Sequence, residues 1–156
     1  SLVSEAFFRV IPAGFQPPVS YEIFYLSNLK GVPFLDNLTP NEKGSCFEIS
    51  SEEIIQKIKD NTAVRFKTTI TIEKEGVYKF YTRSDDGSIL KVNNQVVANN
   101  DGDHGIIEKS GEISLKTGVY QLEVLWFNGG GGGWLDVYYE TAGISKQIIP
   151  PSIFKP

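Results

Sequence analysis

The stretch AVRFKTTITIEKEGVYKFYTRS (63–84) contains two runs in which residues of two kinds alternate along the chain. Apolar residues or Thr occupy every second position from Val64 to Ile72, and Tyr78, Phe80 and Thr82 repeat the pattern after EKEG. A period of two is typical of β-strands with one buried face. Because only a short turn separates the two runs, the stretch predicts a β-hairpin.

The rest of the chain repeats this pattern at short intervals. SILKVNNQVVA (88–98) predicts a second hairpin that turns at Asn93-Asn94, since Asn tolerates the positive φ of tight turns. GEISLKTGVYQLEVLWF (111–127) predicts a third, which turns at 116–118. With at most one short helix in the chain, these signals predict an all-β antiparallel fold, a β-sandwich or a barrel. Further expected elements are strands at 19–26 and 134–140, an edge strand at 148–156 and the helix at 50–60.

Length and charge limit the class of protein. A chain of 156 residues suggests one domain. The net charge is −4 and Lys and Arg form no cluster, so neither nucleic acid nor an anionic membrane surface is an expected partner. No apolar run approaches the ~18–20 residues of a membrane helix, so membrane insertion is not expected. Cys46 is the only cysteine, which predicts a buried, unreactive thiol.

The N-terminal residues suggest a domain boundary. The prolines of IPAGFQPP (11–18) cannot donate to a strand ladder, so this segment is interpreted as a linker. Residues 1–10 are then the tail of a preceding β-domain, and 19–156 form the domain itself. The chain has no Met at all, which we interpret as a segment of a larger protein or a processed chain.

The acid-rich stretch 83–105 contains four Asp, four Asn and the only His of the chain. Calcium prefers such oxygen ligands, whereas one His and one Cys cannot form a typical zinc site. The same residue types also dominate surface turns, so composition alone leaves both readings open. Catalysis is not expected, because neighbouring Asp85 and Asp86 are not the facing carboxylate pair of a glycosidase and no nucleophile elbow is present.

A glycine run in FNGGGGGWLD (127–136) is the second unusual stretch. It predicts either a flexible hairpin tip or a loop whose backbone lies close to a ligand. In the second case Gly129, Gly130 and Gly131 would line the ligand. Trp134 would either stack on a sugar or belong to the core. Trp126 shares a face with Tyr120, Leu122 and Val124 and is expected in the core.

Three motifs in order resemble the PA-fourteen domain family, which takes its name from the anthrax protective antigen. They are GVYKFYTRSDDGS (76–88), NDGDHG (100–105) and KTGVYQLEVLWFNGGGGGWLDVYY (116–139). The resemblance implies a β-sandwich that is typically non-catalytic. In the adhesin lectins of the family, two adjacent aspartates joined by a cis peptide bind calcium with an Asn from another loop, and sugar hydroxyls bind the metal directly. It therefore implies a calcium site at Asp85, Asp86 and Asn128, with His104 bracing the loop.

The resemblance also implies a context for the domain. Such modules accompany glycosidases, toxins and adhesins, and SLVSEAFFRV (1–10) resembles the end of a β-domain in chitobiase-type β-N-acetylhexosaminidases. The expected function is a carbohydrate-binding accessory module of an exported glycoside hydrolase, located outside the cell, in the periplasm or on the cell surface. Its expected partners are a glycan containing N-acetylhexosamine or galactose and the catalytic domain of the same chain. The alternative is a structural or protein-interaction spacer with no small ligand.

Overall fold

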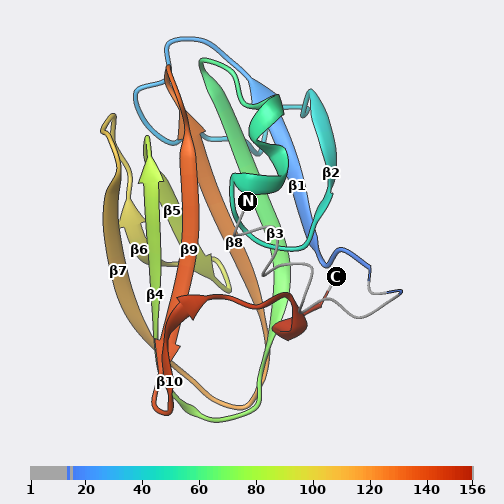
Figure 1. The fold of residues 1–156 in the computed structure, drawn as a ribbon, viewed down its shortest axis with the longest axis vertical. Coiled ribbons are helices and arrows are strands. Elements are labelled where there is room, and N and C mark those ends of the chain that lie inside the picture. Colours follow the sequence, from blue (N-terminus) through green and yellow to red (C-terminus); the bar gives the residue numbers. More distant parts are fainter. Residues whose placement is uncertain (1–13, 15, 156) are drawn as a thin grey trace.

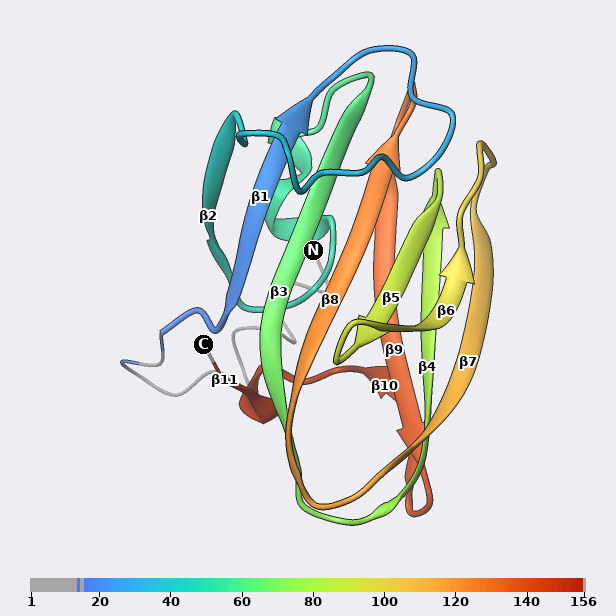
Figure 2. The same cartoon turned by 180° about the vertical axis from the view of Figure 1, so that it is seen from behind.

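The computed structural model of the chain describes Gly14 and residues 16–155, which fold into two antiparallel sheets packed face to face (Figures 1 and 2). The strands are β1 (Val19–Tyr25), β2 (Glu42–Cys46), β3 (Thr62–Ile72), β4 (Gly76–Asp85), β5 (Ser88–Val92), β6 (Gln95–Asn100), β7 (Ile107–Leu115), β8 (Gly118–Asn128), β9 (Trp134–Thr141), β10 (Ile144–Ile148) and β11 (Phe154–Lys155). The larger sheet has the order β2-β1-β3-β8-β5-β6, with β11 also paired to β3, and the smaller has the order β10-β9-β4-β7. The predicted all-β sandwich is confirmed.

The core lies between the two sheets and follows the alternation of the sequence. Phe66 and Ile70 of β3, Trp126 of β8, and Phe80 of β4 are each at most 1% exposed. Leu135, Val137 and Tyr139 of β9 are buried on one side of that strand, as predicted. Trp126 is therefore a core residue, as its phase in the sequence indicates. No helix in the described part of the chain is both long and apolar enough to cross a membrane.

Two of the three predicted hairpins are wrong, although their strands are present. β3 pairs with β8 from Thr62↔Asn128 to Ile72↔Gly118, whereas β4 pairs with β7 and β9 in the other sheet. The EKEG turn after β3 therefore crosses from one sheet to the other, and the turn between β7 and β8 does the same. Alternation identifies the buried side of a strand but not its partner. Both strands of each pair bury their apolar side in the space between the sheets.

The hairpin at 88–98 is confirmed, since β5 and β6 pair and Asn93 and Asn94 have φ of 46° and 66°. The expected helix at 50–60 is a six-residue 3-10 helix, η1 (Glu52–Lys57), without a side-chain cap. The expected edge strand at 148–156 is confirmed only for its last residues, Phe154–Lys155. The prolines at 150 and 151 lead into a 3-10 turn, η2 (Pro151–Ile153), and β11 then pairs with β3. The expectations for 1–10 and most of 11–18 lie outside the described residues.

The segment 26–41 crosses the outer face of the larger sheet between β1 and β2 (Figure 2). It is held there by a second apolar cluster, in which its Leu29 and Leu35 pack with outward-facing Leu125 and Phe127 of β8. Burying a leucine side chain contributes about 1.5–3 kcal/mol, so two of them fix the segment against the sheet. The last residues of β8 are consequently buried on both faces, which positions the residues that follow it.

Gly111 marks the place where the two sheets meet at one edge. A Cβ atom at Gly111, in β7, would overlap the carbonyl oxygen of Val97 in β6. We expect Gly111→Ala to lower the free energy of unfolding by about 2–3 kcal/mol in urea denaturation, because the two backbones must separate. Gly105→Ala is the matched control, since nothing lies within 4 Å of its Cβ. Equal stability of the two variants would show that the strands separate freely.

Glu48 is partly buried among acidic side chains, near Cys46. The Cys46 thiol is buried and its pKa is raised, as expected of an unreactive cysteine. Burial, with the charges of Glu53, Asp136 and Glu52, raises the pKa of Glu48 from 4.5 to about 7. The unfolded chain releases this proton first as the pH rises. Glu48 therefore lowers the stability of the fold progressively as the pH rises from 4.5 to about 7.

We expect Glu48→Gln to remove this penalty, because glutamine resembles the protonated carboxyl. Relative to the parent chain, the variant should gain free energy of unfolding at pH 8 but not at pH 4. Urea denaturation at both pH values measures the difference, and Glu75→Gln at an exposed position controls for the loss of one charge. The same difference between variant and parent at both pH values would contradict the raised pKa.

Candidate functional site

The two adjacent aspartates lie where β4 ends, between the ends of β8 and β9. The peptide bond between Asp85 and Asp86 is cis, as predicted. The backbone N–H of Asp86 donates to the carbonyl of Phe127 at 3.0 Å, and Phe127 N–H donates to the carbonyl of Gly87 at 3.1 Å. Asp85 pairs with Trp134, the first residue of β9. The pair is thus attached directly beside Asn128 and the glycine run.

The carboxylate of Asp86 is buried and connects two loops. Its Oδ2 accepts the N–H of Gly129 at 2.7 Å, and its Oδ1 accepts the N–H of His104 at 3.2 Å. Burial raises the pKa of Asp86; the Gly129 N–H lowers it, and the neighbouring Asp103 and Asp85 raise it further, so that the net shift is upward. A nearby positive charge, such as that of a divalent cation, would favour the ionised form of this group.

Asn128 is fully buried and has a vacant acceptor. Its Nδ2 donates to the carbonyls of Lys59 and Gly131 at 3.0 and 3.1 Å, which fixes the orientation of the amide. Its Oδ1 has no hydrogen-bond partner among the described residues. An unpaired buried polar atom costs about 1–3 kcal/mol, so this oxygen is expected to bind a group that the protein itself does not supply.

The glycine run is held in place by hydrogen bonds to the turn at 59–61. Asn61 N–H donates to the carbonyl of Gly129 at 3.2 Å, and Gly131 N–H donates to Oδ1 of Asp60 at 3.2 Å. A Cβ at Gly129 would lie only 3.4 Å from Oδ2 of Asp86. The prediction that the loop backbone lies close to the site therefore describes Gly129. Gly132, by contrast, has open space around it.

Trp134 is partly exposed and is not a core residue. Its indole N–H donates to Oδ2 of Asp136 at 2.8 Å, an oxygen that also accepts the hydroxyl of Tyr138 at 3.3 Å. These contacts fix the orientation of the ring beside Asp85, its partner in the strand register. The ring is therefore available at the edge of the site.

His104 braces the loop after β6, as the sequence predicts. Its Nδ1 and Nε2 lie 2.6 and 2.8 Å from the carbonyl oxygens of Gly105 and Asn100. Burial lowers the pKa of His104, but these carbonyls and the charges of Asp86 and Asp85 outweigh it, and the net shift is upward. Because both ring nitrogens face acceptors, the imidazole holds the loop best when it is protonated.

The family resemblance did not assign three residues around the site, although two of them, Asp101 and Asp103, belong to the acid-rich stretch 83–105. Asp103 lies close enough to Asp86 to raise its pKa, and Asp60 anchors the glycine run. Asp101 accepts the N–H groups of Val32 and Gly102, each at 2.8 Å, and so joins this loop to the segment 26–41. Asn61, next to Asp60, is the one residue here whose conformation the local sequence indicates. Its φ is 57°, and Asn in an Asp-Asn-Thr turn favours such a positive φ.

The donor atoms of the site suit a hard cation. Two carboxylates and an amide oxygen are calcium ligands rather than zinc ligands. No three His, Cys, Asp or Glu side chains among residues 16–155 are grouped as a metal site. The set Asp85, Asp86 and Asn128 contains only two carboxylates, so a cation there would depend on the unpaired oxygen of Asn128 and on oxygens from outside the protein.

The fold and the cis Asp85–Asp86 pair at this end of the sandwich define a class of β-sandwich domain, and comparison with known families agrees. The family model described as the PA14 domain matches residues 22–152. The chain belongs to this family, the PA-fourteen family that its motifs resemble. No curated protein sequence matches the chain.

Solved structures share the fold across most of the chain. A PA14 sugar-binding domain from an RTX adhesin superposes with a TM-score of 0.75 at 19% identity, over 89% of this chain and 98% of that one. The Epithelial Adhesin 6 A domain of Candida glabrata, in complex with Galβ1-3GlcNAc, has a TM-score of 0.65 at 12% identity, over 93% and 90%. A β-glucosidase from Kluyveromyces marxianus has a TM-score of 0.61 at 14% identity, over 78% of this chain but 17% of the enzyme.

The glycine run offers a test of which positions the site needs. A Cβ at Gly133 would lie 2.9 Å from the Trp126 ring and 3.1 Å from the Asn128 side chain, whereas a Cβ at Gly132 meets nothing within 4 Å. We expect Gly133→Ala to lower the free energy of unfolding by about 1–3 kcal/mol and Gly132→Ala to change it by less than about 0.5 kcal/mol. Thermal and urea unfolding measure both. Similar values for the two variants would mean that the run does not pack against Asn128.

Proposed function

We propose that this domain is a non-catalytic carbohydrate-binding module that holds a glycan through a calcium ion at Asp85, Asp86 and Asn128. The observation that carries the proposal is the fully buried Oδ1 of Asn128, which has no hydrogen-bond partner among the described residues. Asn128 ends β8 directly after Phe127, whose carbonyl accepts the N–H of Asp86 in the cis Asp85–Asp86 pair. The two carboxylates would supply the negative charge and the amide oxygen a neutral ligand. Calcium takes six to eight oxygens, which leaves positions for sugar hydroxyls.

The protein's own residues would prepare this site for the ion. The Asp86 carboxylate is oriented by the Gly129 and His104 N–H groups, and the amide of Asn128 by two carbonyls. Pre-oriented ligands lose little conformational freedom when the ion binds. The raised pKa of Asp86 reflects burial and neighbouring negative charge, which a bound cation would compensate.

A glycan is the favoured ligand because the surroundings of the site suit sugars. The partly exposed ring of Trp134 offers an apolar face at the edge of the site, and the Gly129, Gly130 and Gly131 backbone allows a ligand to approach closely. The two adhesin domains with this fold are named for sugar binding or were solved with a disaccharide. Glycans containing N-acetylhexosamine or galactose are the proposed ligands.

We further propose that the domain belongs to an exported glycoside hydrolase, of the chitobiase type, and acts outside the cell, in the periplasm or at the cell surface. The similar fold within a β-glucosidase supports such an accessory role. The module would pack against the catalytic domain of the same chain and keep it near its polymer. A spacer with no ligand is the second candidate, which Phe34 favours because its ring is 71% exposed within 19–35.

Isothermal titration of the folded domain with calcium, followed by N-acetylglucosamine or galactose, tests the proposal. We expect heat from calcium alone, and heat from one of the sugars only when calcium is present. Asp85→Asn should weaken calcium binding at least about tenfold, since even the loss of a residue that merely supports a metal ligand costs about 10–100-fold. The variant retains the shape of the side chain, and circular dichroism checks its fold.

Asp101→Asn is the matched control from the same acid-rich stretch. Its Oδ1 can still accept the N–H of Val32, and it is not a proposed ligand, so its calcium affinity should equal that of the parent chain. Absence of calcium heat with the parent protein would reject the calcium site and favour the spacer. Sugar binding that is equally strong in a chelator would reject the role of the metal while keeping the glycan.

A further inference from the structure

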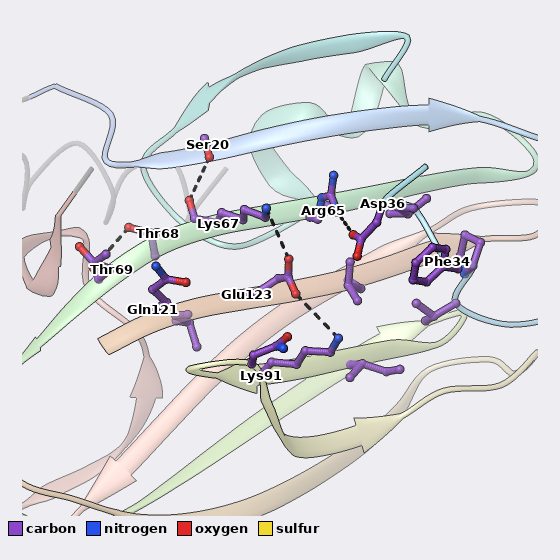
Figure 3. A pocket seen from close by; sticks show the side chains of 17 residues that line it. Ser20, Phe34, Asp36, Arg65, Lys67, Thr68, Thr69, Lys91, Gln121 and Glu123 are labelled. Atoms are coloured by element: carbon purple, nitrogen blue, oxygen red, sulfur yellow. Dashed lines mark hydrogen bonds and ion pairs between the residues drawn. The ribbon is translucent and has the colours of Figure 1, made fainter. Parts of the chain in front are cut away.

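A groove on the outer face of the larger sheet is not part of the Asp85–Asp86 site. It encloses about 690 Å³ between the segment 26–41 and strands β3, β8 and β5 (Figure 3). Its floor consists of outward-facing side chains, among them Lys67, Gln121, Glu123 and Lys91, and Phe34 lines one end. A smaller hollow shares Thr69, Asn94 and Gln121 with it and extends it to Val119.

The groove follows the outer side of β8 for most of that strand. Every second residue from Val119 to Leu125 faces the groove. The six residue steps between these two residues span about 20 Å. Its two ends are apolar, with Phe34 and Leu125 at one and Val119, which is 64% exposed, at the other. The middle is polar. An extended molecule with apolar faces and regularly spaced polar groups matches this shape.

The polar middle offers hydrogen-bond donors and acceptors that are not fully engaged. Lys67 and Lys91 lie on either side of Glu123, each with its Nζ 3.9 Å from a carboxylate oxygen (Figure 3). This separation exceeds a hydrogen bond, so each group can still bind a ligand hydroxyl. Arg65 is different, since Glu22 and Asp36 each accept from it at 2.8 Å. Five charged groups among the described residues line the groove, and Glu22 pairs with one of them, Arg65. The charges of these six groups balance, which favours a neutral ligand.

The strand pairing excludes a peptide bound as an extra strand. Each floor strand is hydrogen-bonded on both sides: β1 to β2 and β3, β3 to β1 and β8, β8 to β3 and β5, and β5 to β8 and β6. A peptide added to a sheet needs a free edge for its backbone, and this groove has none. Recognition by these strands therefore depends on their side chains, so the ligand needs polar groups opposite the polar middle of the groove.

Phe34 gives the groove an aromatic surface that the fold does not need. Its ring is 71% exposed, while its neighbour Leu35 is 3% exposed and anchors the segment in the second apolar cluster. A ligand that covers this ring would remove its apolar surface from water, which is favourable. The C–H faces of sugar rings are suitable partners for such a ring, because aromatic side chains provide rigid apolar area at a small cost in entropy.

We infer that this groove is a second, calcium-independent binding site for a neutral oligosaccharide chain. Phe34 stacks on a sugar ring at one end, and Lys67, Glu123 and Lys91 exchange hydrogen bonds with hydroxyl groups in the middle. This site does not depend on the proposed calcium site. Asp101 joins the segment that carries Phe34 to the loop beside Asp86, so the two sites share one supporting contact.

Chemical-shift mapping by NMR tests the inference in a chelator, which removes the contribution of calcium. The labelled domain is titrated with cellohexaose, xylohexaose and chitohexaose. For at least one of them, we expect shifts concentrated at Phe34, Lys67, Lys91, Gln121 and Glu123. Absence of groove shifts with all three, or shifts confined to 83–88, 100–105 and 128–134, overturns the inference. Groove shifts with an Ala-Thr hexapeptide but not with the sugars overturn it as well.

Substitutions at Phe34 distinguish stacking of its ring on a sugar from nonspecific binding to exposed apolar side chains. Phe34→Ala should weaken binding of the oligosaccharide roughly tenfold, the loss expected for one aromatic contact. Phe34→Tyr keeps the ring and should retain the affinity. Val77→Ala removes an apolar side chain that is 51% exposed on the other sheet and should also retain it. If Phe34→Ala binds as the parent chain does, the stacking role and the inference with it are rejected.

If calcium-dependent sugar binding fails while the shifts in chelator persist, the groove stands without the proposed function. If the calcium site binds sugar and the groove shows no shifts, the proposed function stands without the groove. Asp85→Asn should leave the binding in chelator unchanged, because Asp85 lies outside the groove. A loss of groove binding in that variant would contradict the independence of the two sites.

Discussion

The hydrogen bonds of one buried carboxylate organise this end of the domain. Asp86 accepts the N–H groups of Gly129, after β8, and of His104, after β6. It thereby connects the end of β4 in the smaller sheet with two loops that lead from the larger sheet to the smaller one. Gly129 of the glycine run and the loop at 101–105 are both held by this connection.

The segment 26–41 is the second organising feature, because it serves two surfaces at once. Its leucines bury the outer side of the end of β8, while Val32 is bound by Asp101 beside the aspartate pair. Phe34 of the same segment overhangs the groove. Because the segment is fixed by packing on one side, a ligand at either surface meets a wall that is already formed.

The sequence predicted which residues are buried better than it predicted which strands pair. Alternation in 63–84 marked Phe66, Ile70 and Phe80 as inward-facing, and they are. It could not show that β3 and β4 lie in different sheets, because the apolar residues of both strands face the same core. Asn93-Asn94 was predictable as a turn because the turn chemistry is local.

The candidate site was predictable only where a motif carried it. The cis bond at Asp85–Asp86 followed from the family resemblance and not from composition. The contacts of Asp60 with the glycine run and of Asp103 with Asp86 join residues distant in sequence, and no local pattern encodes them. Phe34 carried no signal either, because an isolated aromatic residue in a loop looks the same whether it is buried or exposed.

The pairing of β3 with both β1 and β11 determines how the domain can be attached to its surroundings. Ser20 pairs with Lys67 and Lys155 pairs with Thr69, so the strands nearest the two ends of the described chain lie two residues apart along β3. Thr62, which pairs with Asn128, is five residues further along the same strand, or about 17 Å. A polypeptide joined to either end of the described chain, or to both ends, would therefore be attached near the same part of β3. Asn128, beside the aspartate pair, would then lie at the opposite end of β3 from that connection.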